Sequence, residues 1–201
     1  MSVKVGYDID GVLANFVDGF LQEGINTRLG TNFESSQMSA FSFQDSFGID
    51  KLVETEEFNR LRDNGLFERL QPYNDMIDSV KKLDRYKLDI YFITHRSKRA
   101  IEQTYQWFMK YDIPMGKGIY FTPMDRTPTK GELATYLGIE HFIDDCYANC
   151  IEMKSHGIKT YVMNRPWNNT FDNKKDGIYR INNGEEFTKK MLSTRPFLEG
   201  V

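Results

Sequence analysis

The sequence predicts an α/β fold in which a parallel sheet carries helices on both faces and a small, mainly helical cap is inserted after the first strand. Short apolar runs alternate with helix-length segments along most of the chain, as in βαβ units. The first run leads directly into two carboxylates, Asp8 and Asp10. Roughly fifty residues of different character then precede the second run, which is more than a crossover helix requires.

Five runs have the length and the apolar, β-branched or aromatic content of strands. They are residues 3–7, 88–93, 118–121, 141–143 and 158–163. Helices are predicted between them wherever apolar side chains recur at helical spacing, as Met76, Ile77, Val80 and Leu83 do. The predicted helices cover residues 74–86, 100–111 and 132–137, with a closing helix over 184–195.

The stretch from residue 17 to residue 71 is interpreted as the inserted cap. It begins with a helix through Phe20, continues through a segment rich in Ser and Phe, and ends with a second helix. Asp50 is placed to cap the start of that helix, and Asn64 with Gly65 to end it. The resulting division assigns residues 1–16 and 72–201 to a catalytic core and residues 17–71 to the cap.

Composition excludes several classes of protein. The 201 residues contain 40% hydrophobic side chains, which fits a globular domain, and no apolar run reaches the roughly 18 residues of a membrane helix. The chain enters a strand almost at once, without the pattern of a secretion signal, so we expect a cytoplasmic protein. A net charge of −3 argues against a large nucleic-acid surface. Cys146 and Cys150 lack further ligands for zinc, and a disulfide is not expected in that compartment.

Asp8 and Asp10 are the most informative pair in the chain. Residues two apart in an extended segment point to the same side, so both carboxylates face one point beyond the first strand. Two such acids repel each other, and a divalent cation with oxygen ligands would relieve the repulsion. The alternatives are an Asp-Gly hairpin turn, which needs a strand directly after Gly11, and an EF-hand, whose required glycine and glutamate are here Leu13 and Gly19.

Other strand and helix ends carry groups that complement these acids. The second strand leads into Thr94 and His95, at a turn where helix N–H groups can bind an oxyanion. Thr129 and Glu132 form a predicted capping box that places Lys130 in a first helical turn. Lysine is unfavourable there with respect to the helix dipole, which makes sense if it holds a phosphate or a carboxylate pair. The alternatives are a capping threonine, a loop histidine and a surface lysine.

Asp144 and Asp145 repeat the opening pattern, because an apolar strand again runs into acids. Adjacent strand residues point to opposite sides, so both can reach one metal only where the chain has left the strand. We expect Asp145 to be the direct ligand and Asp144 to orient it, although the reverse assignment remains open. An acidic surface loop is the alternative for both residues.

The order Asp8-x-Asp10-Gly11-Val12, then Thr94, Lys130 and Asp144-Asp145, resembles the four motifs of the haloacid dehalogenase-like (HAD) phosphohydrolases, and predicts their Rossmannoid fold. Within that superfamily three further stretches resemble the 5'(3')-deoxyribonucleotidases and related bacterial and phage nucleotidases. These stretches are residues 10–16, 65–72 and 163–168. Residues 28–60 match no motif, and His95 and Cys146 lie beside motifs at positions where the nucleotidases vary.

The resemblance implies a set of roles for these residues. Asp8 would be the nucleophile and form an aspartyl phosphate, and Asp10 would be the general acid and base. Mg²⁺ would be held by Asp8, the Asp144-Asp145 pair and Asp10, the last through its backbone carbonyl. Thr94, His95 and Lys130 would bind the phosphate; for substrate contacts Phe16 is implied, and Phe43 is a candidate within the cap.

The expected function is therefore a Mg²⁺-dependent phosphatase of small phosphate monoesters, most specifically a 5'-nucleotidase of nucleoside or deoxynucleoside monophosphates. One alternative keeps the scaffold and changes the substrate to a sugar phosphate, phosphoglycolate or a nucleic-acid 3'-phosphate. Another is a module that binds metal and phosphate without catalysis. The presence of both Asp8 and Asp10 argues against that module, because binding alone requires neither a nucleophile nor a proton carrier.

Overall fold

The computed structural model describes residues 2–122 and 127–194 of the chain. Its centre is a six-stranded sheet in the order β3-β2-β1-β4-β5-β6, with every neighbouring pair parallel. The strands are β1 (Lys4–Tyr7), β2 (Asp89–Thr94), β3 (Ile119–Phe121), β4 (His141–Asp144), β5 (Lys159–Met163) and β6 (Tyr179–Ile181). The α/β fold class predicted from the sequence is confirmed.

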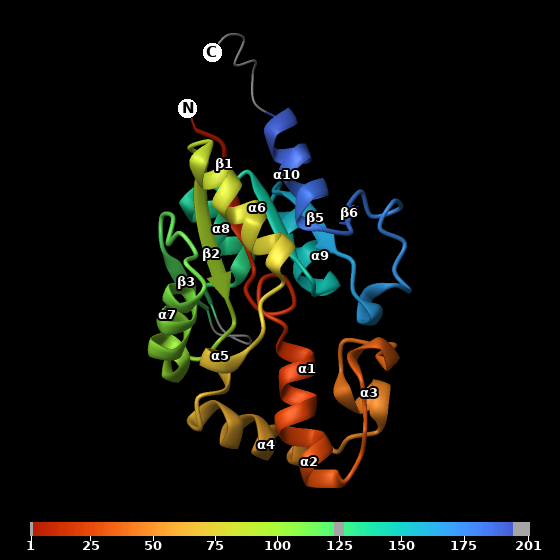
Figure 1. Ribbon diagram of the computed structural model, residues 1–201. Coiled ribbons are helices and arrows are strands. Elements are labelled where there is room, and N and C mark those ends of the chain that lie inside the picture. The colour runs from red at the N-terminus through yellow and green to blue at the C-terminus, as the bar shows by residue number, and fades with distance from the viewer. Residues whose placement is uncertain (1, 123–126, 195–201) are drawn as a thin grey trace.

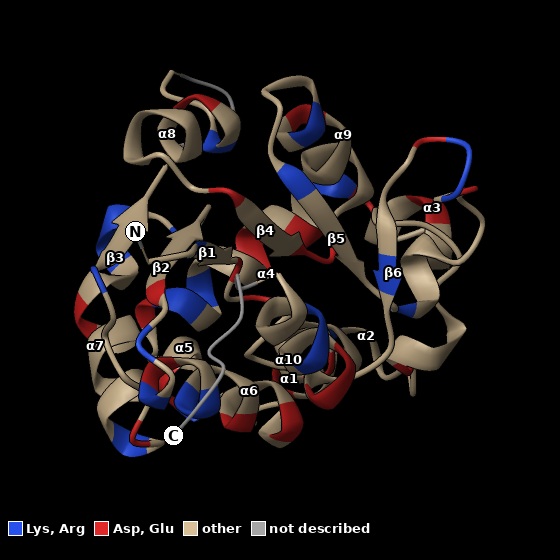
Figure 2. Ribbon diagram, turned by 90° about the horizontal axis from the view of Figure 1, so that it is seen from above, with Lys and Arg blue, Asp and Glu red and all other residues tan. Residues whose placement is uncertain are grey.

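Helices cover both faces of the sheet (Figure 2). On one face lie α8 (Lys130–Leu137) and α9 (Tyr147–Ser155), and on the other α6 (Asn74–Arg85), α7 (Ile101–Lys110) and α10 (Gly184–Ser193). Short 3₁₀ turns, η3 (Lys98–Ala100) and η4 (Pro166–Asn168), follow β2 and β5.

Both faces of the sheet are closed by apolar side chains. On the face of α6, α7 and α10, Tyr7 packs edge-on against Phe187, and Phe92 against Phe108. On the opposite face, Phe142 and Met153 belong to a second cluster of buried residues. The apolar character of the strands therefore reflects their burial on both sides, as expected for a parallel sheet.

The strand register aligns the carboxyl ends of the central strands. Tyr7 is opposite both Phe92 of β2 and Ile143 of β4. The next residue, Asp8, continues this alignment, because its backbone N–H donates to the carbonyl of Ile143 at 2.9 Å. Side chains that follow β1, β2 and β4 consequently meet at one edge of the sheet.

The segment after β1 forms a separate helical layer beyond these carboxyl ends (Figure 1). It consists of α1 (Phe16–Phe20), a π-helical turn η1 (Leu21–Ile25), α2 (Asn26–Leu29), the 3₁₀ turn η2 (Ser35–Gln37), α3 (Phe43–Phe47), α4 (Lys51–Asp63) and α5 (Leu66–Arg69). Asp50 caps α4, with its carboxylate accepting from the backbone of Leu52 and Val53, and Asn64 follows its last turn, both as predicted. The interior of the layer is aromatic: the ring of Phe20 lies 5.1 Å from that of Phe43.

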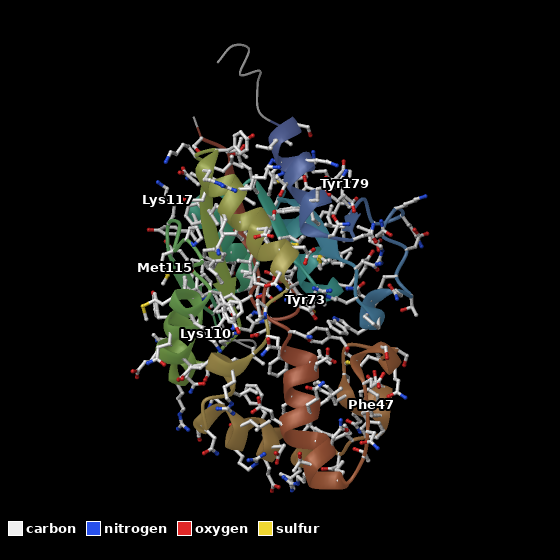
Figure 3. The ribbon with its side chains drawn as sticks, in the orientation of Figure 1. Phe47, Tyr73, Lys110, Met115, Lys117 and Tyr179 are labelled. Carbon is white, nitrogen blue, oxygen red and sulfur yellow. The ribbon has the colours of Figure 1, made fainter. Side chains whose placement is uncertain are left out.

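The chain passes between the sheet and the helical layer through two segments that lie side by side. Asn15 donates its backbone N–H to Gln71, and Tyr73 donates its own to Leu13, both at 2.8 Å. Figure 3 shows Tyr73 where the two parts meet. These bonds lie at the ends of the segment 17–71, and the division into a core of residues 1–16 and 72–201 and a cap of residues 17–71 remains a proposal.

The remaining differences from the sequence prediction are small. Strand β6 was not predicted, the closing helix ends at Ser193, and Arg195 at the end of the predicted range lies outside the described residues. Within residues 2–122 and 127–194, no helix combines the length and apolarity needed to cross a membrane. Cys146 and Cys150 are free thiols.

Candidate active site

The candidate active site lies where β1, β2 and β4 end and α8 begins. Asp8 directly follows β1, Thr94 closes β2, Asp144 closes β4, and Lys130 is the first residue of α8. Thr129 caps that helix because its hydroxyl oxygen accepts from the backbone N–H of Glu132, and the carboxylate of Glu132 in turn accepts from the backbone N–H of Thr129. The predicted capping box is therefore present, and it fixes the start of α8 at Lys130.

Lys130 connects two of the acids. Its ammonium group lies 2.8 Å from Asp8 Oδ1 and 2.8 Å from Asp144 Oδ2, and its side chain is almost completely buried. Burial alone disfavours the charged amine, but the two carboxylates outweigh that cost, so the pKa of Lys130 is raised. The amine is accordingly a fixed positive charge at neutral pH.

Asp144 and Asp145 both turn toward Asp8. Carboxylate oxygens of the three residues lie within 4.8 Å of one another, and all three side chains are buried. Asp144 is surrounded by donors, because it also accepts from the backbone N–H of Cys146 and the side-chain amide of Asn149. Asp145 accepts from the indole N–H of Trp167 at 2.9 Å.

The charges of this cluster fit a divalent cation. Three carboxylates face the single ammonium of Lys130, so the formal sum is negative by two. Burial, with the charges of Asp144 and Asp10, raises the pKa of Asp8 to about 7 against the opposing charge of Lys130, and burial together with Asp144 and Asp8 raises the pKa of Asp145. Both shifts indicate that further positive charge would stabilise the ionised carboxylates, and oxygen ligands suit a hard metal ion.

Asp10 is held differently. Arg96 donates to both of its oxygens, through Nε at 2.9 Å and Nη2 at 2.7 Å. The guanidinium group is buried, donates also to Thr104, and lies 4.4 Å from the centre of the Phe67 ring. The carboxylate of Asp10 is therefore clamped against α7 and the cap helix α5, and it lies outside the cluster of Asp8, Asp144 and Asp145.

Thr94 and His95 lie at the end of β2 on the side predicted to bind phosphate. The hydroxyl oxygen of Thr94 accepts from the backbone N–H of Arg96 at 3.1 Å, which leaves its own hydrogen available to an anion. His95 is half-buried, and burial followed by the positive charge of Lys130 lowers its pKa to about 4. Its imidazole is therefore neutral at physiological pH, and it would contact a phosphate as a neutral group.

Cys146 adjoins the acids but is not a nucleophile in this setting. Burial and then the charge of Asp144 raise its pKa to about 12. The thiolate, which is the reactive form, is therefore disfavoured at neutral pH.

The two aromatic residues predicted to contact substrate have different positions. Phe16 is half-buried at the start of α1 and stacks between Phe20 and Phe67, directly after the loop that carries Asp10. Phe43 is buried within the cap against Phe20. Phe43 thus belongs to the apolar interior of the helical layer, and contact with substrate remains a prediction for both residues.

Comparison with known proteins gives the family. The sequence profile of the family described as "5' nucleotidase, deoxy (Pyrimidine), cytosolic type C protein" matches residues 1–196. The chain belongs to this nucleotidase family. It is a HAD-superfamily phosphatase, that is, a phosphoric monoester hydrolase, as the four motifs indicated.

One relative carries a nucleotidase name, and two solved structures share the fold. A Bacillus cereus protein named "Putative nucleotidase" is 22% identical over 169 residues, which are 83% of this chain and 88% of that protein. A haloacid dehalogenase-like hydrolase from Streptococcus pneumoniae superposes with a TM-score of 0.69 at 15% identity, covering 94% of this chain and 98% of its own. A HAD family hydrolase from Deinococcus radiodurans, solved with bound phosphate and sodium, has a TM-score of 0.65 at 12% identity, with coverages of 94% and 95%.

Several side chains at the site of this phosphatase were not predicted from the sequence. Arg96 adjoins the predicted Thr94 and His95, but its partner Asp10 is 86 positions away. Trp167 and Asn168 lie in the stretch that resembles nucleotidases, which was given no chemical role, and both contact Asp145. Trp167 and Asn168 could have been suspected from their position, because they follow the fifth predicted strand. The carboxyl ends of the earlier strands β1, β2 and β4 had each supplied a predicted site residue.

Proposed function

We propose that this nucleotidase is a Mg²⁺-dependent enzyme that hydrolyses nucleoside or deoxynucleoside monophosphates through an aspartyl phosphate on Asp8. The observation that carries the proposal is the position of Asp8, a buried carboxylate held by Lys130 at 2.8 Å beside Asp144 and Asp145. A carboxylate fixed in this way can attack phosphorus without first being oriented, so little of the barrier is spent on positioning.

The proposed reaction has two displacements. In the first, an oxygen of Asp8 bonds to phosphorus, the ester P–O bond breaks, and the leaving oxygen takes a proton from Asp10. In the second, water attacks phosphorus, gives its proton to Asp10, and inorganic phosphate leaves as the bond to Asp8 breaks. Arg96 donates one N–H to each oxygen of Asp10, and each oxygen keeps a second lone pair that can carry the transferred proton.

Asp8, Asp144 and Asp145 would hold the metal, with the backbone carbonyl of Asp10 as a further ligand. Mg²⁺ suits a set of carboxylate oxygens, and when bound it would offset the repulsion between these acids and an incoming phosphate. Lys130 would hold a phosphate oxygen as a fixed charge, and Thr94 would donate its free hydroxyl hydrogen. The phosphate in the Deinococcus radiodurans hydrolase supports an anion site in this fold.

The proposed substrate class rests on the family and on the cap. The family description names deoxynucleotides with pyrimidine bases, and Phe16 places an aromatic ring close behind the catalytic loop, where a base could stack. A nucleotide substrate is consistent with the cytoplasmic location that we propose for the protein.

The decisive experiment is release of phosphate by wild type and Asp8→Asn. The substitution keeps the shape of the side chain and removes the nucleophile, so we expect turnover of a deoxynucleoside monophosphate with Mg²⁺ to fall by a factor of about 10³ or more. Asp89→Asn is the matched control, because Asp89 begins the neighbouring strand and pairs with Lys117 away from the site. Equal turnover by Asp8→Asn and wild type would exclude the covalent mechanism.

A panel of substrates then tests the specificity. Deoxynucleoside and ribonucleoside monophosphates, a sugar phosphate, phosphoglycolate and an oligonucleotide 3'-phosphate are compared by kcat/KM, the ratio that measures discrimination. The proposal expects nucleoside monophosphates to give the highest values. A higher kcat/KM for another ester would show that this ester is the preferred substrate, and the phosphatase chemistry would be unaffected.

A further inference from the structure

The loop that follows β5 makes close polar contacts with Asp145. Trp167 is 2% exposed, and its indole N–H donates to Asp145 Oδ2 at 2.9 Å. Asn168 is 1% exposed, and its side-chain amide donates to the backbone carbonyls of Asp145 and Met163, both at 2.8 Å. Two consecutive side chains of η4 thus bind the carboxylate and the backbone of one acidic residue.

Strand β6 anchors this loop from the other side. Arg180 donates to the side-chain oxygen of Asn168 at 2.6 Å and to its backbone oxygen at 2.9 Å. The amide of Asn168 is therefore oriented by Arg180, because its oxygen accepts from the guanidinium while its nitrogen faces Asp145. A chain of hydrogen bonds consequently runs from the edge strand of the sheet to Asp145.

Asp145 differs from Asp144 in the contacts that hold its carboxylate. Asp144 closes β4 and pairs with Lys130, whereas Asp145 lies beyond the strand and forms no ion pair with any side chain in residues 2–122 or 127–194. Its carboxylate packs against Gly11, where an added Cβ would lie 2.1 Å from Oδ2. Trp167 and Gly11 therefore fix the same oxygen, one by a hydrogen bond and the other by close packing.

We propose that Trp167 and Asn168 are positioning residues that orient Asp145 for metal binding. Trp167 takes up Oδ2, so the other oxygen of Asp145 would remain available to an ion that Asp8 and Asp144 would also hold, and Asn168 holds the backbone that carries the carboxylate. The inference rests on the metal-dependent function proposed above. Partners that orient a metal ligand in this way affect metal affinity without touching the metal.

The chain offers a matched pair of substitutions for the test. Its two tryptophans, Trp107 and Trp167, are both buried, and each donates its indole N–H to one buried oxygen; for Trp107 this is the carbonyl of Leu70 at 2.8 Å. Trp167→Phe and Trp107→Phe each remove one such donor and a similar volume. Only Trp167→Phe removes a hydrogen bond from a proposed metal ligand.

Metal affinity is measured by titration calorimetry with Mg²⁺, and with Mn²⁺ as a second probe, in the absence of substrate. We expect Trp167→Phe to raise the dissociation constant for the metal by about 10- to 100-fold. Trp107→Phe should retain the wild-type value. A dissociation constant for Trp167→Phe equal to that of wild type would overturn the positioning role. Weakening by the same factor in both would also overturn it, because the effect would then follow from lost packing.

Fluorescence supplies a second readout that does not require Trp167→Phe to fold. In Trp107→Phe the only tryptophan is Trp167, whose N–H is bonded to a proposed metal ligand, so Mg²⁺ should change its emission. Emission of Trp167 that stays constant through metal saturation would contradict the inference. If wild type itself binds no metal, the proposed function fails; if wild type binds metal and the two variants match it, only the positioning role fails.

Discussion

His95 shows how one side chain beside the site can make stability depend on pH. Burial and the charge of Lys130 lower its pKa from 6.5 to about 4. Above pH 6.5 the imidazole is neutral in both states of the protein. Between pH 6.5 and pH 4 the unfolded chain binds a proton that the folded chain does not, so this residue makes the folded state progressively less stable as the pH falls.

We therefore expect His95→Gln to lose less stability than wild type between pH 7 and pH 5. The difference should be about 1 to 2 kcal/mol, since a full pKa unit corresponds to about 1.4 kcal/mol. Urea unfolding at several pH values measures it. His156→Gln on the exposed side of α9 controls for the loss of a histidine as such, and parallel pH profiles for wild type and His95→Gln would contradict the prediction.

Among the elements, α8 carries Lys130 to the acids, and Glu152 of α9 helps to hold the first turn of α8. Glu152 accepts from the backbone N–H of Gly131 at 2.9 Å and from the hydroxyl of Thr129. The negative charge at this helix N-terminus satisfies donors of the first turn and is favourable to the helix dipole. Glu152 thus holds the turn in which Lys130 lies.

We expect Glu152→Gln to destabilise the protein by about 0.5–2 kcal/mol, the range for loss of a charged cap. Hydrogen exchange should quicken at the first amides of α8, and turnover should fall because Lys130 becomes less fixed. Glu102→Gln is the comparison, since Glu102 is exposed on α7 and accepts a 3.3 Å bond from Gln106 on the same helix. Unchanged exchange at Gly131 in Glu152→Gln would show that the capping box alone holds the turn.

The elements also show where reasoning from sequence succeeds. Each of the five predicted strands is present with ends within one residue of the prediction, because buried parallel strands are continuous apolar runs. Strand β6 escaped prediction because the charged Arg180 at its centre interrupts the apolar run, whereas all three residues of the equally short β3 are apolar or aromatic. The turn η1 was also missed, since it joins α1 to α2 by a change in hydrogen-bond pattern within one apparent helix.

The same limit applies to the site. The acids and Lys130 were found because each follows a recognisable strand or caps a recognisable helix. The contacts of Arg96 with Asp10 and of Trp167 with Asp145 join segments 86 and 22 residues apart. Their partners depend on how the loops fold over the sheet edge, which no local periodicity encodes.

At the scale of the whole molecule, side chains around the site connect the loop after β5 to the segments that lead into the helical layer. Arg165, after β5, donates to the carbonyl of Gly11 at 2.7 Å and lies 3.6 Å from the centre of the Tyr73 ring. Tyr73 in turn donates to Asn15, which caps the first helix of the cap. The loop after β5, the catalytic loop and the entrance to the cap are therefore connected around the proposed metal.

This arrangement predicts that metal binding stabilises the entire fold. A cation that binds only the folded chain raises the free energy of unfolding by about 2.7 kcal/mol at a concentration 100 times its dissociation constant. We expect Mg²⁺ to raise the midpoint of thermal unfolding measured by calorimetry, and EDTA to abolish the rise. Asp145→Asn should unfold at a midpoint that barely responds to Mg²⁺, because one charged ligand has gone while the packing against Gly11 and the loop after β5 is nearly preserved. A wild-type midpoint that is independent of Mg²⁺ would show that the folded chain does not bind the ion at these three acids.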